Sequence, residues 1–476
     1  MQKETSRLSI GEKVGYSLGD SAANFIFQTM VVLQLSFYTD TFGISAAAAG
    51  TLLLVARFWD AIFDPIMGVI ADRTNTRWGK FRPWILWTAV PFGIMGFLAF
   101  STPGFSPAGK LIYAYVTYIL LMTVYSANNL PYSALSGVMT GDVVERTSLS
   151  SYRFIFAMLA AVAIQGLALP MVKYFGQGDS AKGYQWTMGI FCTLAVLFFV
   201  ITFLSAKERV KPDPAQKSSV GQDFKDLLRN GPWITLFLLT IVIFITLAMR
   251  GGDILYYFKY YADKGAMLSL LQAIGMAPAA QDADSIVGTT FSLFNVCGLV
   301  TTLIGIMFSK MLAVRFGKRN VFIVGLGLTT VFWAMFILIP PAGVLTAFIV
   351  QALSQLAYGV TVPLLWAMMG DVADYAEWKT GRRATGVVFA AIVFGLKAGL
   401  GFGGAIGGWL LAHYGYVPNV EQNAQALMGI RLTASIFPAI PFAVGVVLLF
   451  FYTINREMEF AIQDELAARR KQYAKS

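Results

Sequence analysis

The tetrapeptide Arg77-Trp78-Gly79-Lys80 returns as Arg315-Phe316-Gly317-Lys318, 238 residues later in a chain of 476 residues. Each copy follows an apolar segment that is long enough to cross a membrane, and each precedes another such segment. A similarity repeated at half the chain length is the mark of a duplicated structural unit. The sequence therefore predicts two copies of one arrangement of helices.

A second repeat occurs in the same order along the chain. Pro131 precedes the tripeptide Gly141-Asp142-Val143, and Pro363 precedes Gly370-Asp371-Val372. The spacing from the proline to the Gly-Asp-Val tripeptide differs by three residues between the two copies. This second repeat extends the predicted symmetry toward the end of each half.

The composition is that of a protein embedded in a lipid bilayer. Hydrophobic residues make up 57% of the chain and charged residues 13%, and the mean hydropathy is +0.63. A helix needs about 20 apolar residues to cross the hydrocarbon core. We therefore expect an all-α membrane protein with twelve transmembrane helices, at 14–37, 45–71, 82–102, 110–133, 150–173, 185–205, 233–258, 286–309, 320–340, 344–370, 384–412 and 430–453.

The repeat divides these twelve segments into two sets of six. We expect an N-terminal six-helix bundle at 1–206, a cytoplasmic linker at 207–232, and a C-terminal six-helix bundle with a cytoplasmic tail at 233–476. Two pseudo-symmetric six-helix bundles make the major facilitator fold, in which the substrate site lies at mid-membrane between the halves.

Lys and Arg are distributed unevenly between the two sides of the predicted membrane. If the N-terminus is cytoplasmic, about 26 of the 36 Lys and Arg residues lie on that side. The opposite side holds five, namely Lys110, Lys173, Lys182, Lys259 and Lys264. This asymmetry predicts that both termini are cytoplasmic. It also explains the net charge of +10 without a nucleic-acid partner.

Three ionisable side chains interrupt the apolar segment 45–71. Arg57, Asp60 and Asp64 are spaced by three and four residues, so they share one face of a helix. Charges in the middle of a bilayer are costly and usually line a protein interior or a water-filled cavity. Two carboxylates opposite one arginine leave a net negative charge, which suits a proton or a small cation. The alternative is a structural ion pair with a spare carboxylate.

The first predicted helix carries a polar stripe formed by Ser17, Asp20, Asn24 and Gln28. Steps of three and four residues place these side chains in one sector of the helix. The stripe favours a surface that lines a wet cavity, and the alternative is hydrogen bonding between helices.

The fourth predicted helix combines aromatic rings with amides. Tyr125, Asn128 and Asn129 suit a sugar, because rings stack on apolar sugar faces and amides both donate to and accept from hydroxyl groups. Arg153 begins the next helix, where it could bind a substrate oxygen or Asp142. These two interpretations of Arg153 stay open at the level of sequence.

Charged residues also interrupt the second half. Arg250-Gly251-Gly252-Asp253 lies inside the seventh segment, where the glycine pair favours a break or bend. Asp253 could neutralise Arg250, as Asp20 could neutralise Arg153. We include Arg250, Asp253 and Trp366 of the tenth segment among the candidate sugar-binding residues. The stretch 259–285 that follows the seventh segment is predicted to hold a short amphipathic helix.

The eleventh segment carries glycines at 395, 399, 403 and 407, a small-residue stripe that favours close packing against a neighbouring helix. Lys397 points about 200 degrees away from this stripe. A lysine in such a helix needs an acidic partner, for which Asp60 and Asp64 are the candidates. The charged turns and helix ends on the cytoplasmic side are candidate gating residues, namely Asp72, Arg73, Arg77, Lys80, Asp142, Asp371 and Asp374.

Several of these stretches resemble the glycoside-pentoside-hexuronide:cation symporter family. The resemblance lies in the run 54–68, the loop 77–84, Asp371-Val372-Ala373-Asp374-Tyr375 and Gly415-Tyr416-Val417-Pro418-Asn419, and it extends over nearly the whole chain. The family belongs to the major facilitator superfamily, so the resemblance implies a bacterial inner-membrane transporter.

The resemblance also implies roles for particular residues. Asp60 and Asp64 fall on the family's cation ligands, Ser126 on a nearby hydroxyl, and Lys397 on a lysine beside the cation site. Arg153 falls on a sugar-binding arginine. Two acids that bind galactosides are replaced by Asn24 and Asn129, a sugar-packing tryptophan by Ser133, and an asparagine between the aspartates by Phe63. These departures argue against a galactoside, and the loss of the asparagine removes a possible sodium ligand.

The sequence therefore predicts a secondary active transporter that couples inward movement of H⁺ or Na⁺ to uptake of a glycoside, in particular a pentoside, xyloside or short oligosaccharide. A hexuronide symporter and an uncoupled sugar facilitator or exchanger are the alternatives. No enzyme is expected, because one histidine and two separated cysteines supply no catalytic constellation within the membrane. We expect no cofactor besides the coupling cation, which Asp60 and Asp64 would bind as a metal site if it is Na⁺, and a monomeric protein.

Overall fold

The computed structural model describes residues 8–140, 143–209, 228–278, 282–380 and 385–473. The chain divides into two compact units. Unit 1 comprises Met1–Ala215, Leu271–Leu293 and Gly408–Gln422, and unit 2 comprises Gln216–Leu270, Phe294–Gly407 and Asn423–Ser476. The domain boundaries expected at 206/207 and 232/233 stay a prediction.

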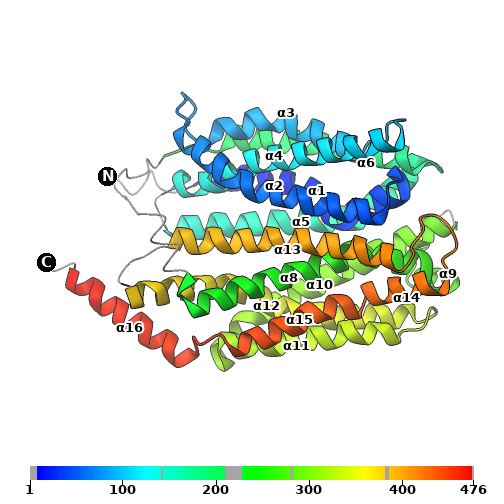
Figure 1. Cartoon of the computed structure of the whole chain (residues 1–476). Helices are drawn as coiled ribbons and strands as arrows, with labels where there is room; N and C mark the ends of the chain where they lie inside the picture. Colours follow the sequence, from blue (N-terminus) through cyan, green and yellow to red (C-terminus); the bar gives the residue numbers. More distant parts are fainter. Residues whose placement is uncertain (1–7, 141–142, 210–227, 279–281, 381–384, 474–476) are drawn as a thin grey trace. The chain divides into compact units, whose positions relative to one another are not determined.

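Unit 1 is built mainly from the six helices of the N-terminal half (Figure 1). They are α1 (Ile10–Ser36), which continues into a π-helix η1 (Phe37–Phe42), α2 (Ala46–Arg73), α3 (Arg82–Ala99), α4 (Pro107–Met139), α5 (Val143–Gly176) and α6 (Ser180–Ser205). Within this unit α1 packs on α5 and α6, α3 packs on α4 and α6, and α2 packs on α4.

Unit 2 repeats this arrangement with the helices of the C-terminal half. They are α8 (Gly231–Tyr256) with the π-helix η2 (Tyr257–Tyr261), α9 (Lys264–Ala273), α10 (Ala283–Phe316), α11 (Lys318–Met335) with a 3₁₀ turn η3 (Phe336–Leu338), α12 (Val344–Thr380), α13 (Thr385–His413), α14 (Ala424–Thr433), α15 (Ile436–Phe450) and α16 (Arg456–Tyr473). Here α11 packs on α12 and α15, and α8 packs on α15, matching the pairs of unit 1.

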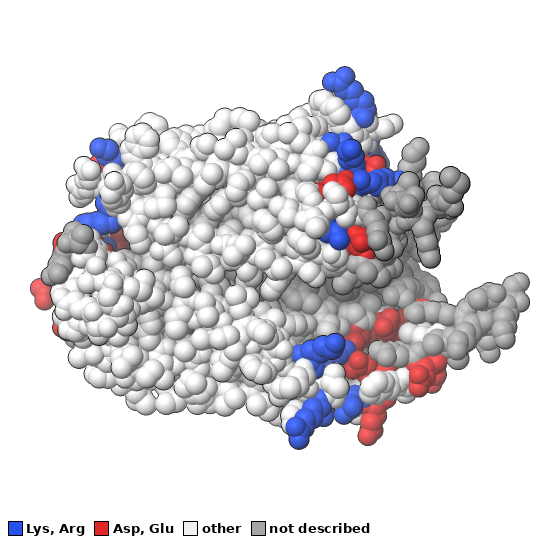
Figure 2. Space-filling view, turned by 180° about the vertical axis from the view of Figure 1, so that it is seen from behind, with Lys and Arg blue, Asp and Glu red and all other residues white. Residues whose placement is uncertain are grey.

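Ten of the described helices or helix pairs are long and apolar enough to cross a membrane by length and composition. The other two of the twelve predicted segments correspond to α1, which carries the polar stripe, and α3, which has 18 residues. The predicted all-α fold is confirmed, and within the described residues the only β pairing is an isolated bridge between Thr76 and Gly79. In Figure 2 the acidic and basic side chains gather toward the helix ends, and the surface between them is white.

Backbone geometry confirms the duplication that the tetrapeptides predict. Gly79 and Gly317 occupy equivalent turns and both have positive φ, +112° and +83°, a region that suits glycine because it lacks a Cβ atom. The first helix of each half also ends in a π-helix, η1 after α1 and η2 after α8. Both halves thus share the same turn geometry and the same irregular helix end.

The glycine stripe of α13 contacts α8, as close packing requires. A Cβ atom on Gly399 would lie 2.6 Å from the carbonyl oxygen of Ile241, and one on Gly403 would lie closer still to that of Ile245. Backbone atoms cannot move away as a flexible side chain can, so only glycine fits at this distance. The predicted packing role of the stripe is confirmed.

The structure contradicts a break at the glycine pair of α8 and an uninterrupted last span. α8 runs without interruption through Gly251 and Gly252, because its intrahelical hydrogen bonds continue past the glycine pair, and the backbone departs from α geometry only at η2. The final span, predicted as one helix, is instead divided into α14 and α15. Pro438 explains the division, since its nitrogen cannot donate to the carbonyl oxygen four residues earlier, at Ala434.

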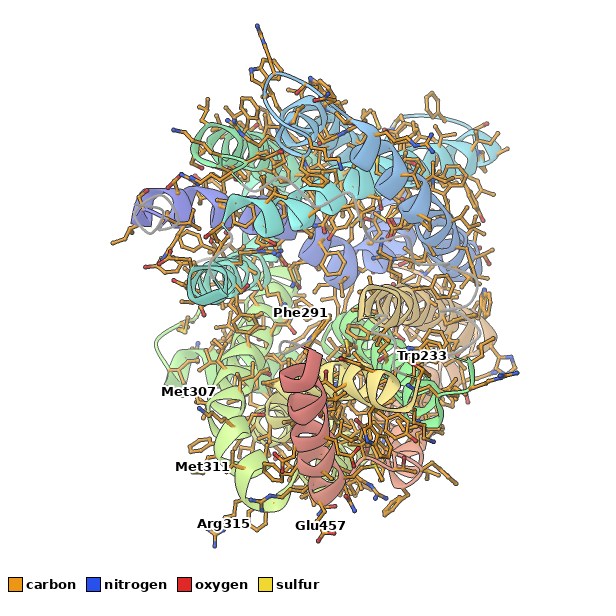
Figure 3. The ribbon with its side chains drawn as sticks, turned by 90° about the vertical axis from the view of Figure 1, so that its left-hand side faces the viewer. Trp233, Phe291, Met307, Met311, Arg315 and Glu457 are labelled. Atoms are coloured by element: carbon orange, nitrogen blue, oxygen red, sulfur yellow. The ribbon has the colours of Figure 1, made fainter. Side chains whose placement is uncertain are left out.

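The short helix expected within 259–285 is present as α9, whose Met267 and Leu271 are buried. A second helix, α16, was not expected. It contacts α12 and buries Ile462 and Leu466 in the core of unit 2. Figure 3 shows α16 with Glu457 labelled near its start, and Met307, Met311 and Arg315 along the outer face of α10.

Candidate functional site

The residues predicted to bind the coupling cation lie on α2 and α4 in unit 1. Asp60 is fully buried and Arg57 nearly so, and a guanidinium nitrogen of Arg57 lies 3.8 Å from Asp60 Oδ2. Ser126 of α4 donates a short hydrogen bond to Asp60 Oδ1. Asp64 follows one turn later and is half-buried. The structure thus brings Arg57, Asp60 and Ser126 together, while their role in cation binding stays a prediction.

Neighbouring contacts fix the positions of these side chains. The indole nitrogen of Trp59 donates to Thr123 Oγ1 at 2.7 Å, which joins α2 to α4 beside the Asp60–Ser126 bond. The Arg57 guanidinium lies 5.7 Å from the ring centre of Phe27 on α1. Removing one partner from a buried charge pair typically costs about 3–5 kcal/mol, because the other charge is left uncompensated. A substitution of either Arg57 or Asp60 is therefore expected to destabilise the other residue's charge as well.

Arg153 forms an ion pair with Asp20, the acid of the polar stripe on α1. Its Nε atom lies 2.5 Å from Asp20 Oδ2, and both side chains are partly exposed. The guanidinium also lies over the rings of Tyr132 and Tyr16, at 5.0 and 5.6 Å from their centres. These two rings stack at 4.6 Å. The expectation that Asp20 neutralises Arg153 is confirmed, whereas Asp142 lies outside the described residues.

The rest of the stripe forms hydrogen bonds along α1 and to α5. Gln165 of α5 donates to Gln28 at 3.3 Å, Gln28 donates to Asn24 at 3.3 Å, and Asn24 donates to the carbonyl oxygen of Asp20 at 2.8 Å. Asn24 and Gln28 are half-buried, whereas Ser17 is buried. The hydrogen-bonding alternative therefore accounts for part of the stripe.

The amides of α4 face different neighbours. Asn128 is 1% exposed and donates to Thr88 of α3 at 2.8 Å, so its donor is used in helix packing. Asn129 and Tyr125 are half-buried and contact each other, at 3.5 Å between Nδ2 and the phenol oxygen. The structure does not bring Asn128 to the same face as Asn129.

In unit 2, Arg250 is held by groups other than Asp253. It donates to the carbonyl oxygen of Ala434 through a short hydrogen bond and to Gln351 Oε1 at 3.1 Å. Its guanidinium lies 4.7 Å from the ring centres of Trp333 and Phe336. The expected neutralisation of Arg250 by Asp253 is therefore wrong, because the carbonyl freed by Pro438 and an amide of α12 take its donors.

Arg250 and Asp253 are also closed to a sugar in this conformation, with exposures of 4% and 0%. Trp366 of α12 is exposed. The predicted pairing of Lys397 with Asp60 or Asp64 joins residues of the two units and stays a prediction.

One candidate gating residue of unit 1, Lys80, lies at the start of α3, which the distant Glu208 caps. Backbone N–H groups of Lys80, Phe81 and Arg82 donate to the carboxylate of Glu208 at 2.7–3.0 Å. Helix α3 has no cap from its own N-cap side chain, so Glu208 satisfies the donors at its start. Arg73 and Arg77 are exposed, and for Asp72 only the backbone is described.

The equivalent turn of unit 2 contains an ionic cluster. Lys318 binds both carboxylate oxygens of Asp371 at 2.7 Å and Glu459 of α16 at 2.9 Å. Asp374 is half-buried on the same helix as Asp371. This cluster ties the ends of α11 and α12 to α16.

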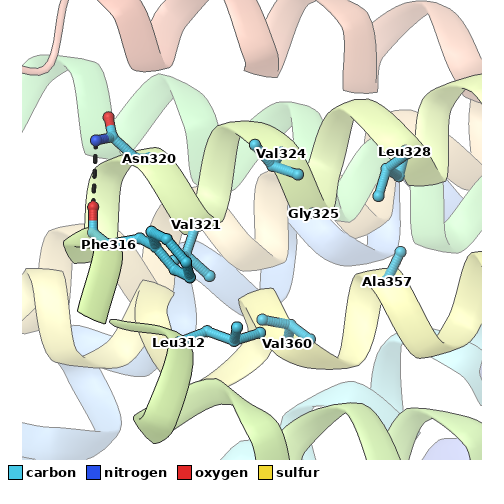
Figure 4. A pocket seen from close by; sticks show the side chains of 9 residues that line it. All are labelled: Leu312, Phe316, Asn320, Val321, Val324, Gly325, Leu328, Ala357 and Val360. Carbon is cyan, nitrogen blue, oxygen red and sulfur yellow. Dashed lines mark hydrogen bonds between the residues drawn. The ribbon is translucent and has the colours of Figure 1, made fainter. Parts of the chain in front are cut away.

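One pocket of unit 2 differs in kind from these sites. It lies between α10, α11 and α12, has a volume of about 440 Å³, and is lined by Leu312, Phe316, Asn320, Val321, Val324, Gly325, Leu328, Ala357 and Val360 (Figure 4). The amide of Asn320 donates to the carbonyl oxygen of Phe316 at 3.2 Å. An apolar lining of this kind cannot bind the hydroxyl groups of a sugar.

Comparison with known proteins identifies the family. Residues 15–456 match the family described as MFS/sugar transport protein. The chain is 36% identical over 464 residues to the inner membrane symporter YicJ of Escherichia coli, with 97% of this chain and 95% of that protein covered. The chain belongs to the glycoside-pentoside-hexuronide:cation symporters, within the MFS/sugar transport protein family.

Two further relatives of this transporter carry substrate names. The isoprimeverose transporter of Lactiplantibacillus pentosus is 34% identical over 451 residues, covering 94% of this chain and 89% of that protein. The glucuronide carrier protein homolog of Escherichia coli is 32% identical over 460 residues, covering 96% and 95%. Among solved structures, a D-xylose-proton symporter aligns with a TM-score of 0.59 at 15% identity, covering 93% of this chain and 96% of that one, which shows the fold alone.

Two acids of this transporter that bind helix ends, Glu208 and Glu459, do not stand out in the sequence. Glu208 lies in the predicted linker. The sequence gives only an indirect indication of its role: Phe81 at the start of α3 cannot cap a helix, so the N–H groups there need an acceptor from elsewhere. Glu459 lies in a tail with a 3.6-residue pattern of apolar residues, which predicts the helix α16 but not the contact of Glu459 with Lys318. The family is one of membrane transporters, so the prediction that the protein is no enzyme is confirmed.

Proposed function

We propose that this transporter couples the inward movement of a cation, H⁺ or Na⁺, to the uptake of a glycoside by alternating access. The observation that carries the proposal is the fully buried Asp60, which accepts a hydrogen bond from Ser126 and lies 3.8 Å from Arg57. An ionisable group kept at this depth in a membrane helix is costly, so a role in ion movement explains its presence better than packing does.

In this proposal Asp60, Asp64 and the Ser126 hydroxyl supply the oxygen ligands of the cation. Carboxylate and hydroxyl oxygens can bind either a proton or Na⁺. Lys397 pairs with one carboxylate when the cation is absent and yields it when the cation binds. An uncoupled facilitator or exchanger would give the two acids of α2 no role.

The sugar-binding surface proposed in unit 1 consists of the Asp20–Arg153 pair, the half-buried Tyr125 and the amides Asn24 and Asn129. The ion pair offers both acceptor and donor groups to sugar hydroxyls, and the amides do the same without a net charge. Because Asp20 already neutralises Arg153, the surface suits a neutral glycoside. Trp366 is a further candidate, from unit 2.

The relatives support a pentoside, a xyloside or a short oligosaccharide as the substrate class, since one of them transports isoprimeverose, a xyloside. A hexuronide is the second candidate. It is favoured by the glucuronide carrier homolog and by Arg153, which could leave Asp20 to bind a substrate carboxylate.

We also propose that the transporter lies in a bacterial inner membrane as a monomer with both termini in the cytoplasm. The uneven distribution of Lys and Arg along the sequence supports this orientation. The curated relatives named above come from bacteria, and one is described as an inner membrane symporter.

The test is sugar uptake into membrane vesicles with and without an imposed H⁺ or Na⁺ gradient. We expect the wild type to concentrate sugar only with a gradient, and Asp64→Asn to lose accumulation while it retains downhill equilibration, because a neutral amide cannot hold the cation by charge. Asp284→Asn, at an exposed position at the start of α10, is the control and should accumulate sugar normally. Accumulation by Asp64→Asn at the wild-type level would overturn the cation assignment, and gradient-independent uptake by the wild type would favour the uncoupled facilitator.

A further inference from the structure

Asp253 of α8 is a buried acid that the proposed cation and sugar sites do not use. Its exposed fraction is 0%, and neither carboxylate oxygen has a hydrogen-bond partner among the described residues. Buried polar groups in proteins almost always have such a partner, so this exception calls for a physical explanation.

The carboxyl group is closely packed against α13. A Cβ atom on Gly407 of α13 would lie 2.8 Å from Asp253 Oδ2 and 2.9 Å from Oδ1. The carboxyl group thus occupies space beside α13 that a larger residue at position 407 would fill. Glycine at the end of the packing stripe makes room for this acid.

The nearest cation in the sequence does not compensate the carboxyl group. Arg250 lies one turn earlier on α8, but its donors bind Ala434 and Gln351, and its plane lies over two aromatic rings. Arg250 and Asp253 are both buried in the same helix without forming an ion pair.

The elements that pack on α8 bring no other described charge to Asp253. α15 contains no charged residue, and α14 contains Arg431, which donates to the carbonyl oxygen of Ile337 and lies over Tyr261. The charges of α12 begin at Asp371, about 30 Å along the helix from Gln351. On α13, Lys397 lies about 15 Å along the helix from Gly407 and His413 ends the helix, and on η2 Lys259 lies over Tyr260.

We propose that Asp253 is a proton-binding site of unit 2, separate from the acids of α2, and that it carries its proton in the conformation described. A neutral acid can be buried without a counter-charge, whereas a carboxylate in the same place would lack both a donor and a cation. When the site opens, the proton passes to water and the negative charge stays on Asp253. Arg250 then lies within reach as its partner at a spacing of three residues.

This inference goes beyond the proposed function, since Asp60 and Asp64 hold the coupling cation there. It adds a second ionisable position, in the other half of the molecule. A transporter with this position takes up or releases a proton at unit 2 whenever its conformational change opens the α8–α13 contact.

The direct test is infrared spectroscopy of the full-length protein in lipid nanodiscs, before and after exchange into D₂O. A protonated carboxylic acid gives a carbonyl stretching band apart from those of carboxylates and amides. We expect this band in the wild type and a weaker band in Asp253→Asn, which lacks the contribution of that acid. Asp282→Asn is the matched control and should keep the full band, because the hydrogen bond from Lys173 lowers the pKa of Asp282 to about 2 and so keeps that acid ionised. Absence of the band in the wild type, or a band of equal intensity in Asp253→Asn, would overturn the proposal.

Thermal unfolding supplies a second, independent measurement. Asparagine resembles the neutral acid, so Asp253→Asn should fold and match the wild type at acidic pH. Unfolding of the wild type exposes the acid and releases its proton, so the wild type should lose stability relative to the variant as the pH rises. A variant that fails to fold, or is less stable than the wild type at every pH, would contradict a neutral Asp253. Neither measurement uses sugar or a gradient, so failure of the proposed symport would leave both results standing.

Discussion

At the scale of single residues, the structure sorts the charged side chains of the membrane helices by their partners. Asp20 pairs with Arg153, and Asp60 is held by Ser126 near Arg57. Arg250 binds a backbone carbonyl and an amide, which leaves Asp253 apart from it. Similar spacing in sequence, three residues from a cation to an acid, therefore produces an ion contact on α2 and none on α8. The difference lies in what the neighbouring helices offer to each arginine.

The Ser126 hydroxyl gives the sharpest residue-scale prediction. Ser126→Ala removes the donor to Asp60, and a hydrogen bond to a charged group contributes about 1.5–3 kcal/mol. We expect the apparent affinity for Na⁺ to fall by about tenfold or more, since 1.4 kcal/mol corresponds to a factor of ten. For H⁺ the expected direction is the opposite, because a hydrogen bond donated to a carboxylate favours its ionised form. The measurement is the cation concentration or pH that gives half-maximal sugar uptake.

Ser126→Thr is the matched control, because it keeps a hydroxyl group at the same carbon. It should stay near the wild type in cation dependence. Equal cation dependence in Ser126→Ala and the wild type would mean that the hydrogen bond serves packing and not ion binding.

At the scale of helices, irregular features decide which groups meet. Pro438 divides the last span and releases the carbonyl group of Ala434, which then accepts from Arg250. The glycines of α13 allow α8 to approach until backbone atoms nearly touch. Glu208 completes the start of α3 from a segment far along the chain. In each case a local deviation in one element supplies or satisfies a polar group in another.

The packing of α8 on α13 predicts a stability change at Gly403. Gly403→Ala places a Cβ atom against the carbonyl oxygen of Ile245, and overpacking of this kind typically costs about 1–3 kcal/mol. We expect a lower unfolding temperature in detergent or nanodiscs, measured by a thermal-shift assay.

Gly327→Ala is the matched control within α11. No heavy atom lies within 4 Å of the position that its Cβ would take, and alanine favours a helix over glycine by about 0.5–1 kcal/mol. The control should be unchanged or slightly more stable. A Gly403→Ala variant as stable as this control would show that the two helices can separate at no cost.

At the scale of the whole molecule, the two units repeat one arrangement of packed helices but carry different polar residues. The turn glycines, the π-helix ends and the helix pairs that pack together are shared. The polar residues are not shared, because unit 1 carries the Asp20–Arg153 and Asp60–Ser126 contacts and unit 2 carries Arg250 and Asp253. Duplication thus accounts for the fold, and later divergence accounts for the sites.

The substrate class is a prediction about the whole transporter. Asn24 and Asn129 supply amides without the charge of a carboxylate, so affinity for neutral sugars should be modest, and a xyloside or short oligosaccharide should compete best. The measurement is counterflow with xylosides, galactosides and glucuronides in parallel. Strong glucuronide uptake without competition by xylosides would favour the hexuronide symporter instead, and strong galactoside transport would show that the two amides matter little.

The sequence by itself determined the class of fold. Every segment that crosses a bilayer must be an apolar helix of about 20 residues, so hydropathy reveals these segments, and the repeated tetrapeptide shows that they form two similar halves. It also determined the acids of α2 as candidates, since charged residues stand out in apolar helices. Pro438 is a local signal for the interruption of the last span, which hydropathy alone does not reveal.

Only the tertiary structure decided which polar groups meet. Glu208 reaches the start of α3 across more than 120 residues of chain, and Arg250 turns to Ala434 and Gln351 instead of the acid one turn away. Helical periodicity tells which residues share a face, but it carries no information about the groups on the facing helix. A buried charge is satisfied by those groups, so its partner is fixed by packing and not by its own spacing in the sequence.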